Sequence, residues 1–140
     1  MVSKTLVVIL AAVTVGLLAF FVTSTQNPPK TDLKADVTIQ IPRGASTPPS
    51  EWSGGMVFDK SYFNPPLIRV VIGVNSTVGW VNSDEVSHTA TSLNVPQGAA
   101  SFDSGLMKPG STFVTKLTVA GRYVYFCSVH PWAGGVIEAK

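Results

Sequence analysis

Cysteine, histidine and charge are all scarce in this chain, and each scarcity excludes a class of function. Cys127 is the single cysteine among 140 residues, so no disulfide can form within the chain. Charged residues make up 13% of the sequence, and its ten Lys or Arg are scattered rather than clustered. Nucleic-acid binding therefore has little support. Cys127 itself must join another chain, react, lie buried or hold a metal.

Common catalytic motifs are also absent from the sequence. There is no phosphate-binding loop, no Gly-rich dinucleotide fingerprint and no zinc-protease motif. A Cys–His nucleophile stays open as an alternative, although no third residue to orient the histidine and no oxyanion motif is evident. An immunoglobulin-like domain would explain why Tyr125 lies two residues before Cys127, but the partner cysteine and a matching central tryptophan are missing.

A long apolar run is present near the start of the chain. No charge interrupts the residues from Thr5 to Val22, and Lys4 precedes them, so the run predicts a secretory signal or a short membrane anchor. The small residues near Ser24 make a passable cleavage site without a clean Ala-x-Ala pattern, so both cleavage and retention stay open.

This run sets the expected domain organisation and location. We expect a signal peptide or anchor over residues 1–24, a tether over 25–34 and one domain over 35–140. The domain is expected outside the cytoplasm, in a periplasm-like space or on the outer face of the cell membrane. Only an uncleaved N-terminal segment would attach it to that membrane.

Strand patterns dominate the domain, and no long window carries a helical period of apolar residues. We expect strands over residues 37–41, 67–72, 77–81, 112–119, 123–127 and 135–139. Reverse-turn residues at 73–76 and 120–122 predict that the second strand pairs with the third, and the fourth with the fifth, as hairpins. Many short strands at this spacing predict an all-β sandwich or barrel.

Three residues of the domain are candidate metal ligands. Cys127 ends an aromatic strand-like run, His130 follows it by three residues, and His88 is the one other histidine. Two imidazoles and a thiolate form the trigonal set that selects type 1 copper. Zinc would tolerate the same ligands, but copper binds more tightly in the divalent series. We therefore expect one mononuclear copper ion on His88, Cys127 and His130.

Three stretches of the domain together resemble the cupredoxins, the type 1 blue-copper family, and in particular their small plastocyanin-like members in archaea. These stretches are Pro66–Asn82 with His88-Thr89 after it, Phe102–Gly105 with Lys108–Phe113, and Gly121–Trp132. The resemblance covers roughly residues 63–139 and includes cupredoxins of ammonia-oxidising archaea. It implies a Greek-key β-sandwich of eight or nearly eight strands, with copper at one end.

The sequence departs from the family pattern at the axial position. Family members usually carry a methionine a few residues after the second histidine, but here Ala133 follows His130-Pro-Trp and has no donor atom. Met56 and Met107 are expected to fill apolar surface instead. Because an alanine followed by two glycines leaves room for solvent, we expect an open axial position beside Ala133 that accepts water or a small anion.

Residues next to the ligands are expected to support them. Thr89 and Ser128 each follow a ligand, so they are expected to bond across the gap or to the thiolate sulfur, with ordinary turn bonding as the alternative. Pro131 and Trp132 are expected to stiffen and shield the ligand loop, although Trp132 is equally suited to the core.

Two acidic residues lie shortly before His88 in the same loop. Asp84 and Glu85 are expected to be solvated loop charges. The alternative is an extra oxygen ligand to the metal, as in a red-copper relative of the family.

The resemblance implies single-electron redox chemistry, and two functions stay open. One is an electron carrier that docks through the apolar surface around Pro131 and Trp132 onto a membrane oxidase or another copper protein. The other is a small-molecule site where nitric oxide or nitrite meets the open copper, with oxidation of nitric oxide to nitrite as its reaction. Copper storage or delivery is a weaker third reading, because such sites are often rich in methionine or cysteine.

Overall fold

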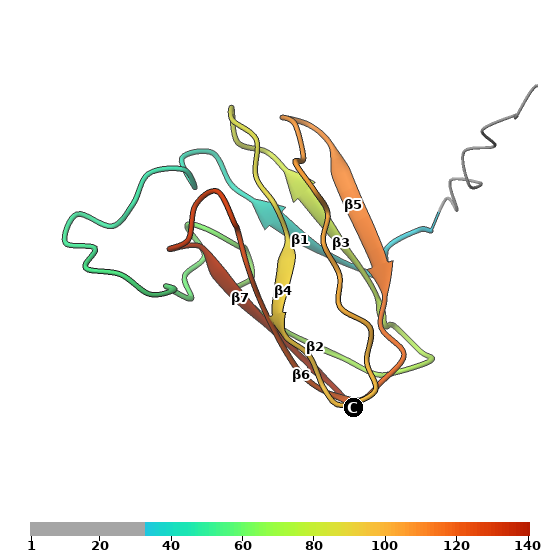
Figure 1. Ribbon diagram of the computed structural model, residues 1–140. Helices are drawn as coiled ribbons and strands as arrows, with labels where there is room; N and C mark the ends of the chain where they lie inside the picture. The colour runs from blue at the N-terminus through green and yellow to red at the C-terminus, as the bar shows by residue number, and fades with distance from the viewer. Residues whose placement is uncertain (1–32) are drawn as a thin grey trace, which may run out of the picture. The chain divides into compact units, whose positions relative to one another are not determined.

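Two β-sheets pack their apolar faces together in this chain (Figure 1). The structure is a computed structural model that describes residues 33–140, and the predicted signal or anchor and most of the tether lie outside the described residues. Within that range the strands are β1 (Val37–Ile41), β2 (Leu67–Val70), β3 (Thr77–Asn82), β4 (Thr91–Asn94), β5 (Thr112–Lys116), β6 (Gly121–Phe126) and β7 (Gly134–Ala139). One sheet has the order β1-β3-β5 and the other has the order β2-β7-β6-β4.

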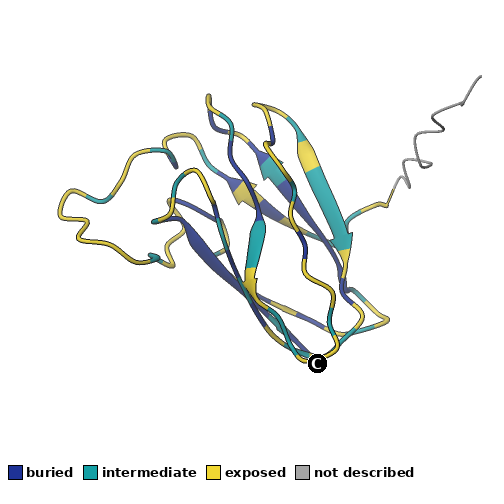
Figure 2. Cartoon of the chain, viewed as in Figure 1, coloured by how far each residue is buried: buried dark blue, intermediate teal, exposed yellow. Residues whose placement is uncertain are grey.

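Alternation and continuous apolar runs decide which faces are buried. In β1, Ile39 and Ile41 are fully buried, whereas Thr38 and Gln40 are exposed. This alternation is expected for a strand that has one face toward solvent. β3 and β7 are buried almost throughout, and Figure 2 shows β7 as a nearly unbroken buried strand. The centre of the core is aromatic, because Tyr125 packs edge-on against both Phe63 and Trp80 at ring distances of 4.9 and 5.3 Å.

The expected all-β Greek-key β-sandwich is confirmed, but both predicted hairpins are wrong. β2 pairs in parallel with β7, whereas β3 lies in the other sheet between β1 and β5. β5 and β6 are likewise in different sheets. The turn at 73–76 carries the chain from one sheet to the other, and so does the connection over 117–120, because Gly121 and Arg122 already belong to β6. Turn residues specify a reversal and leave the pairing partner undefined.

The connections on one side of the sandwich carry the candidate ligands. Loop 83–90 follows β3, loop 127–133 joins β6 to β7, and a long excursion over 42–66 joins β1 to β2. In Figure 1 the β6–β7 loop and the long excursion lie side by side, and a bridge between Val57 and Ala133 joins them. Residues far apart in the sequence therefore meet at this end of the molecule.

The part of the chain that the structure describes contains no helix of the length and apolar character needed to span a bilayer.

Candidate metal centre

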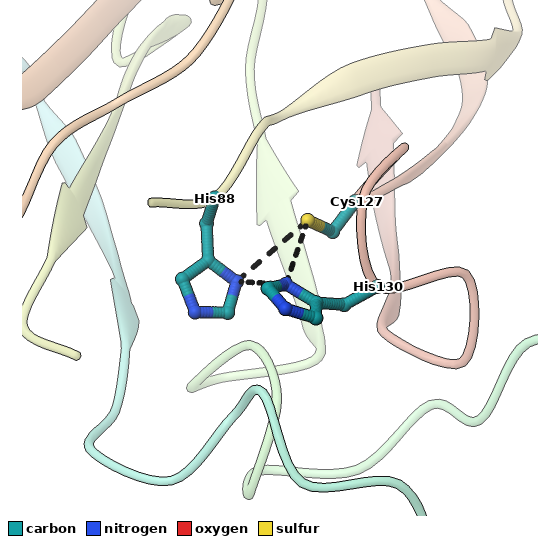
Figure 3. A group of neighbouring side chains, drawn as sticks. All are labelled: His88, Cys127 and His130. Carbon is teal, nitrogen blue, oxygen red and sulfur yellow. Dashed lines mark hydrogen bonds between the residues drawn. The ribbon is translucent and has the colours of Figure 1, made fainter. Parts of the chain in front are cut away.

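The three predicted ligands meet at one point of the structure (Figure 3). The Cys127 sulfur lies 3.6 Å from Nδ1 of His88 and 3.6 Å from Nδ1 of His130. The two Nδ1 atoms lie 3.1 Å apart. His88 and Cys127 are fully buried, and His130 is partly exposed. The three donor atoms thus form a closed triangle whose most accessible corner is His130.

These distances fit a single metal ion. Donors at about 2.0–2.3 Å from one ion in a trigonal plane lie roughly 3.5–3.8 Å from one another. The observed edges of 3.1–3.6 Å are slightly tighter than this, so a small outward movement of the side chains would complete the site. A thiolate with two imidazoles suits copper or zinc, and copper binds more tightly of the two.

Backbone hydrogen bonds hold the ligands at the ends of their strands. Cys127 directly follows β6, and its N–H donates to the carbonyl of Ala133 at 3.0 Å, which closes the loop that carries His130. His88 exchanges two backbone hydrogen bonds with Met107, at 2.8 and 3.1 Å. Met107 is itself buried beside His88, so it packs within the core rather than at the surface.

The environment of the sulfur favours the thiolate. Burial alone would raise the pKa of Cys127, but hydrogen bonds from His88 and from the backbone N–H of Thr89 outweigh this and lower it. The Thr89 N–H lies 3.2 Å from the sulfur. An anionic sulfur is the form that binds a metal ion.

Thr89 also joins the two ligand loops to each other. Its hydroxyl oxygen accepts a hydrogen bond from the N–H of Ser128 at 2.8 Å and lies 3.1 Å from the Ser128 hydroxyl. Thr91 donates a further hydrogen bond to the same oxygen at 3.0 Å. Thr89 is buried, so these bonds fix the distance between the residue after His88 and the residue after Cys127.

The prediction that Asp84 is a solvated charge is wrong. Asp84 is 5% exposed, and its Oδ2 lies 2.8 Å from Nε2 of His88. The carboxylate therefore contacts the side of the ring opposite to the donor atom Nδ1, which places it behind the ligand rather than among the ligands. Glu85 does face solvent, where it pairs with Arg43 at 3.0 Å. The four-residue spacing from Asp84 to His88 was the available signal for this contact.

Both members of this buried pair have shifted pKa values. Burial alone would raise the pKa of Asp84, but hydrogen bonds from Gly44, His88, Glu85 and Ser46 hold it well below its usual range. Burial alone would lower the pKa of His88, but its hydrogen bonds with Cys127 and Asp84 raise it instead.

Trp132 is half-buried and links the ligand loop to the long excursion. Its ring lies 5.3 Å from that of His130, and its indole N–H donates to the carbonyl of Ala45 at 3.1 Å. Trp52 packs edge-on against it at 5.3 Å. Pro131 beside it is exposed.

Ala133 lies at the base of the same loop. It is 1% exposed, and it forms an isolated β-bridge with Val57 of the long excursion. Met56, the residue before Val57, lies close enough to Gly134 that a side chain added there would contact it. The predicted axial region is therefore next to the long excursion.

Sequence comparisons relate this chain to small copper proteins, although no family model matches it. It is 29% identical to amicyanin from Paracoccus denitrificans over 89 residues. The matched region covers 62% of this chain and 66% of that protein. It is 36% identical to chloroplastic plastocyanin from Chlamydomonas reinhardtii over 80 residues. This second matched region covers 53% of this chain and 54% of that protein. The chain thus spans about half to two thirds of the length of these relatives.

A solved structure with the same fold matches over nearly its whole length. A purple cupredoxin from Nitrosopumilus maritimus superposes with a TM-score of 0.59 at 27% identity, covering 74% of this chain and 99% of that one. The shared region therefore amounts to one complete small domain.

Replacing Thr89 with Val should remove the side-chain hydrogen bonds that connect the two ligand loops. The change keeps the shape of the side chain but removes the acceptor for Ser128 N–H, so we expect the free energy of unfolding of the metal-free protein to fall by about 1 kcal/mol. Chemical denaturation measures this loss. Ser128→Ala, which removes only the bond between the hydroxyls, should cost less, and an equal loss in both variants would contradict the assigned role of Thr89.

Proposed function

Because this chain belongs to the cupredoxins, we propose that it binds one type 1 copper ion through His88, Cys127 and His130 and transfers single electrons. The observation that carries this proposal is the triangle of one sulfur and two imidazole nitrogens with edges of 3.1–3.6 Å. The donor types favour copper among the divalent metals. Copper bound there would supply a one-electron redox couple.

The surroundings of the ligands suit electron transfer. Two of the three ligands are fully buried, and hydrogen bonds hold their loops in place. Ligands that hardly move between the two oxidation states keep the reorganisation on electron transfer small. His130 is the partly exposed ligand, so its ring edge offers the shortest route for an electron between the site and a partner.

Exposed apolar residues next to the ligands supply a docking surface. Val129 and Pro131 flank His130, Val86 precedes His88 by two residues, and Leu106 precedes the Met107 that bonds His88. Trp132 is half-buried under Trp52, so it contributes less to this surface than the sequence suggested. We propose that a redox partner, either a membrane oxidase or another copper protein, docks here. Exposed apolar residues that gather near a site are typical of such interfaces.

The proposed place of this chemistry is outside the cytoplasm. The apolar run from Thr5 to Val22 supports export, because a small β-domain has no other evident use for it. Fractionation of the native host should recover the chain in the membrane fraction, or as a soluble extracytoplasmic form that begins near Thr25. Recovery of the full-length chain from the cytosol would contradict export.

Replacing Cys127 with Ser should abolish the intense thiolate-to-copper absorption, because the soft anionic donor is lost. Copper affinity should fall at the same time. Visible spectroscopy of the copper-loaded protein and a copper-binding titration measure the two effects. Met107→Leu is the matched control, since Met107 is buried beside His88 and should leave the colour intact. Full colour in the Cys127 variant would refute the ligand set.

A second proposed function is redox chemistry on a small molecule at an open axial position. The specific observation is the run Ala133-Gly-Gly-Val136, in which no side chain has a donor atom. A copper-containing nitrite reductase from Thermus scotoductus shares the fold at 26% identity, with a TM-score of 0.55 over 74% of this chain and 22% of that one. The reaction we propose is oxidation of nitric oxide to nitrite: a bound cupric ion would accept one electron from the substrate, water would supply the oxygen atom, and two protons would be released.

Azide, nitrite or nitric oxide should change the cupric spectrum of the wild-type protein if the axial position is open. Ala133→Met should weaken that response and make the spectrum more like that of an ordinary blue-copper site, because the new sulfur occupies the position. Ala133→Leu distinguishes filling of the axial position from ligation of the copper. Its side chain should block the small ligands without supplying a sulfur. A wild-type spectrum that ignores all three ligands would leave electron transfer as the function.

A further inference from the structure

Asp84 is a buried carboxylate that no Lys or Arg side chain pairs with among residues 33–140. Its Oδ1 accepts hydrogen bonds from the N–H groups of Gly44 and Glu85, both at 2.9 Å. Its Oδ2 accepts from the N–H of Ser46 at 3.1 Å and contacts Nε2 of His88 at 2.8 Å. The three amide partners can only donate, so the carboxyl is held as an acceptor, which is its ionised form.

This contact decides which nitrogen of His88 carries the proton. An acceptor-only carboxylate against Nε2 requires the hydrogen on Nε2. In the neutral ring, the form that binds a metal, the lone pair is then on Nδ1, which faces Cys127 and His130. A carboxylate behind a ligating histidine also makes the imidazole a stronger donor to the metal.

A short turn in the long excursion holds this carboxylate, and we name residues 44–46 the clamp turn. Gly44 has a φ of +86°, a conformation in which neighbouring N–H groups converge on an anion. The N–H groups of Gly44 and Ser46 bind Asp84, while the carbonyl of Ala45 between them accepts from Trp132. The clamp turn therefore touches both ligand loops, one through Asp84 and the other through Trp132.

We propose that Asp84 is a positioning residue that fixes His88 as a ligand and biases the bound copper toward its oxidised state, and that the clamp turn holds Asp84 in place. This inference rests on the proposed copper site. A negative charge one imidazole away from the metal stabilises the more highly charged cupric ion, and burial weakens the screening of that attraction by water.

Asp84→Asn should raise the reduction potential of the copper-loaded full chain, because it removes the charge at nearly constant size. We expect at least a tenfold shift of the balance toward cuprous copper, which is about 59 mV for a one-electron couple. Glu85→Gln is the matched control: it removes the neighbouring acid, which is exposed and bonded to Arg43. Equal potentials in the two variants would overturn the inference.

Nuclear magnetic resonance of the reduced, copper-loaded chain gives a second readout that does not depend on electron transfer. The Nε2–H proton of His88 should exchange slowly with water in the wild type and in Glu85→Gln, and faster in Asp84→Asn. Unchanged exchange in Asp84→Asn would show that the carboxylate does not hold the ring, and would refute the positioning role.

Gly44→Ala tests the clamp turn and leaves Asp84 in place. It imposes a positive φ on a residue with a Cβ, and Gly98→Ala imposes the same penalty at a φ of +84° in the loop between β4 and β5. Neither added Cβ would meet a neighbouring atom within 4 Å. Gly44→Ala should raise the potential in the same direction as Asp84→Asn, and Gly98→Ala should not. The comparison of Gly44→Ala with Gly98→Ala tests the role of Asp84 even if Asp84→Asn does not fold.

Copper binding by the wild-type chain separates a missing copper site from a missing positioning role of Asp84. A wild-type chain that binds no copper would refute the proposed function and the inference with it. A chain that binds copper normally, with the same potential in Asp84→Asn, Gly44→Ala and their controls, would refute the inference alone.

Discussion

A buried thiolate that must lie between two imidazoles is the constraint on which the rest of the structure depends. Burial of Cys127 disfavours the charged sulfur, so the site must supply compensating donors. The N–H of Thr89 supplies one of them directly, and the Thr89 hydroxyl bonds the loop of Cys127 at Ser128. The same residue therefore stabilises the sulfur and sets the distance between the two loops that carry the histidines.

The sandwich provides a stiff base for this arrangement. Cys127 directly follows β6, in which Tyr123 and Tyr125 are almost wholly buried, and loop 83–90 follows β3, in which Trp80 is fully buried. Tyr125 packs edge-on against Trp80, so the strands that lead to the two loops are tied together in the core. Close packing of this kind resists small displacements, so the donor atoms keep their positions relative to one another. The long excursion then closes the site from the side through the clamp turn.

Local patterns in the sequence predicted the candidate donor set and six of the seven described strands, but they missed β4. Alternation predicted β1, and the types and spacing of His88, Cys127 and His130 predicted a metal centre, which the closeness of the three side chains supports. The wrong hairpins and the missed role of Asp84 have a common physical cause, because both depend on contacts between distant parts of the chain. Asp84 is bonded by an amide 40 residues away, and a turn sequence does not reveal which sheet receives the next strand. The contact between the long excursion and Ala133 could not be predicted for the same reason, because it joins segments that are far apart in the sequence.

We propose that one copper ion is bound by this one sulfur and these two imidazoles. X-ray absorption at the copper edge of the copper-loaded full chain tests it directly, because the method identifies the atoms bound to the metal. We expect one copper ion per chain, with one short bond to sulfur and two bonds to imidazole nitrogen. A copper environment without a sulfur neighbour, or with several, would contradict it.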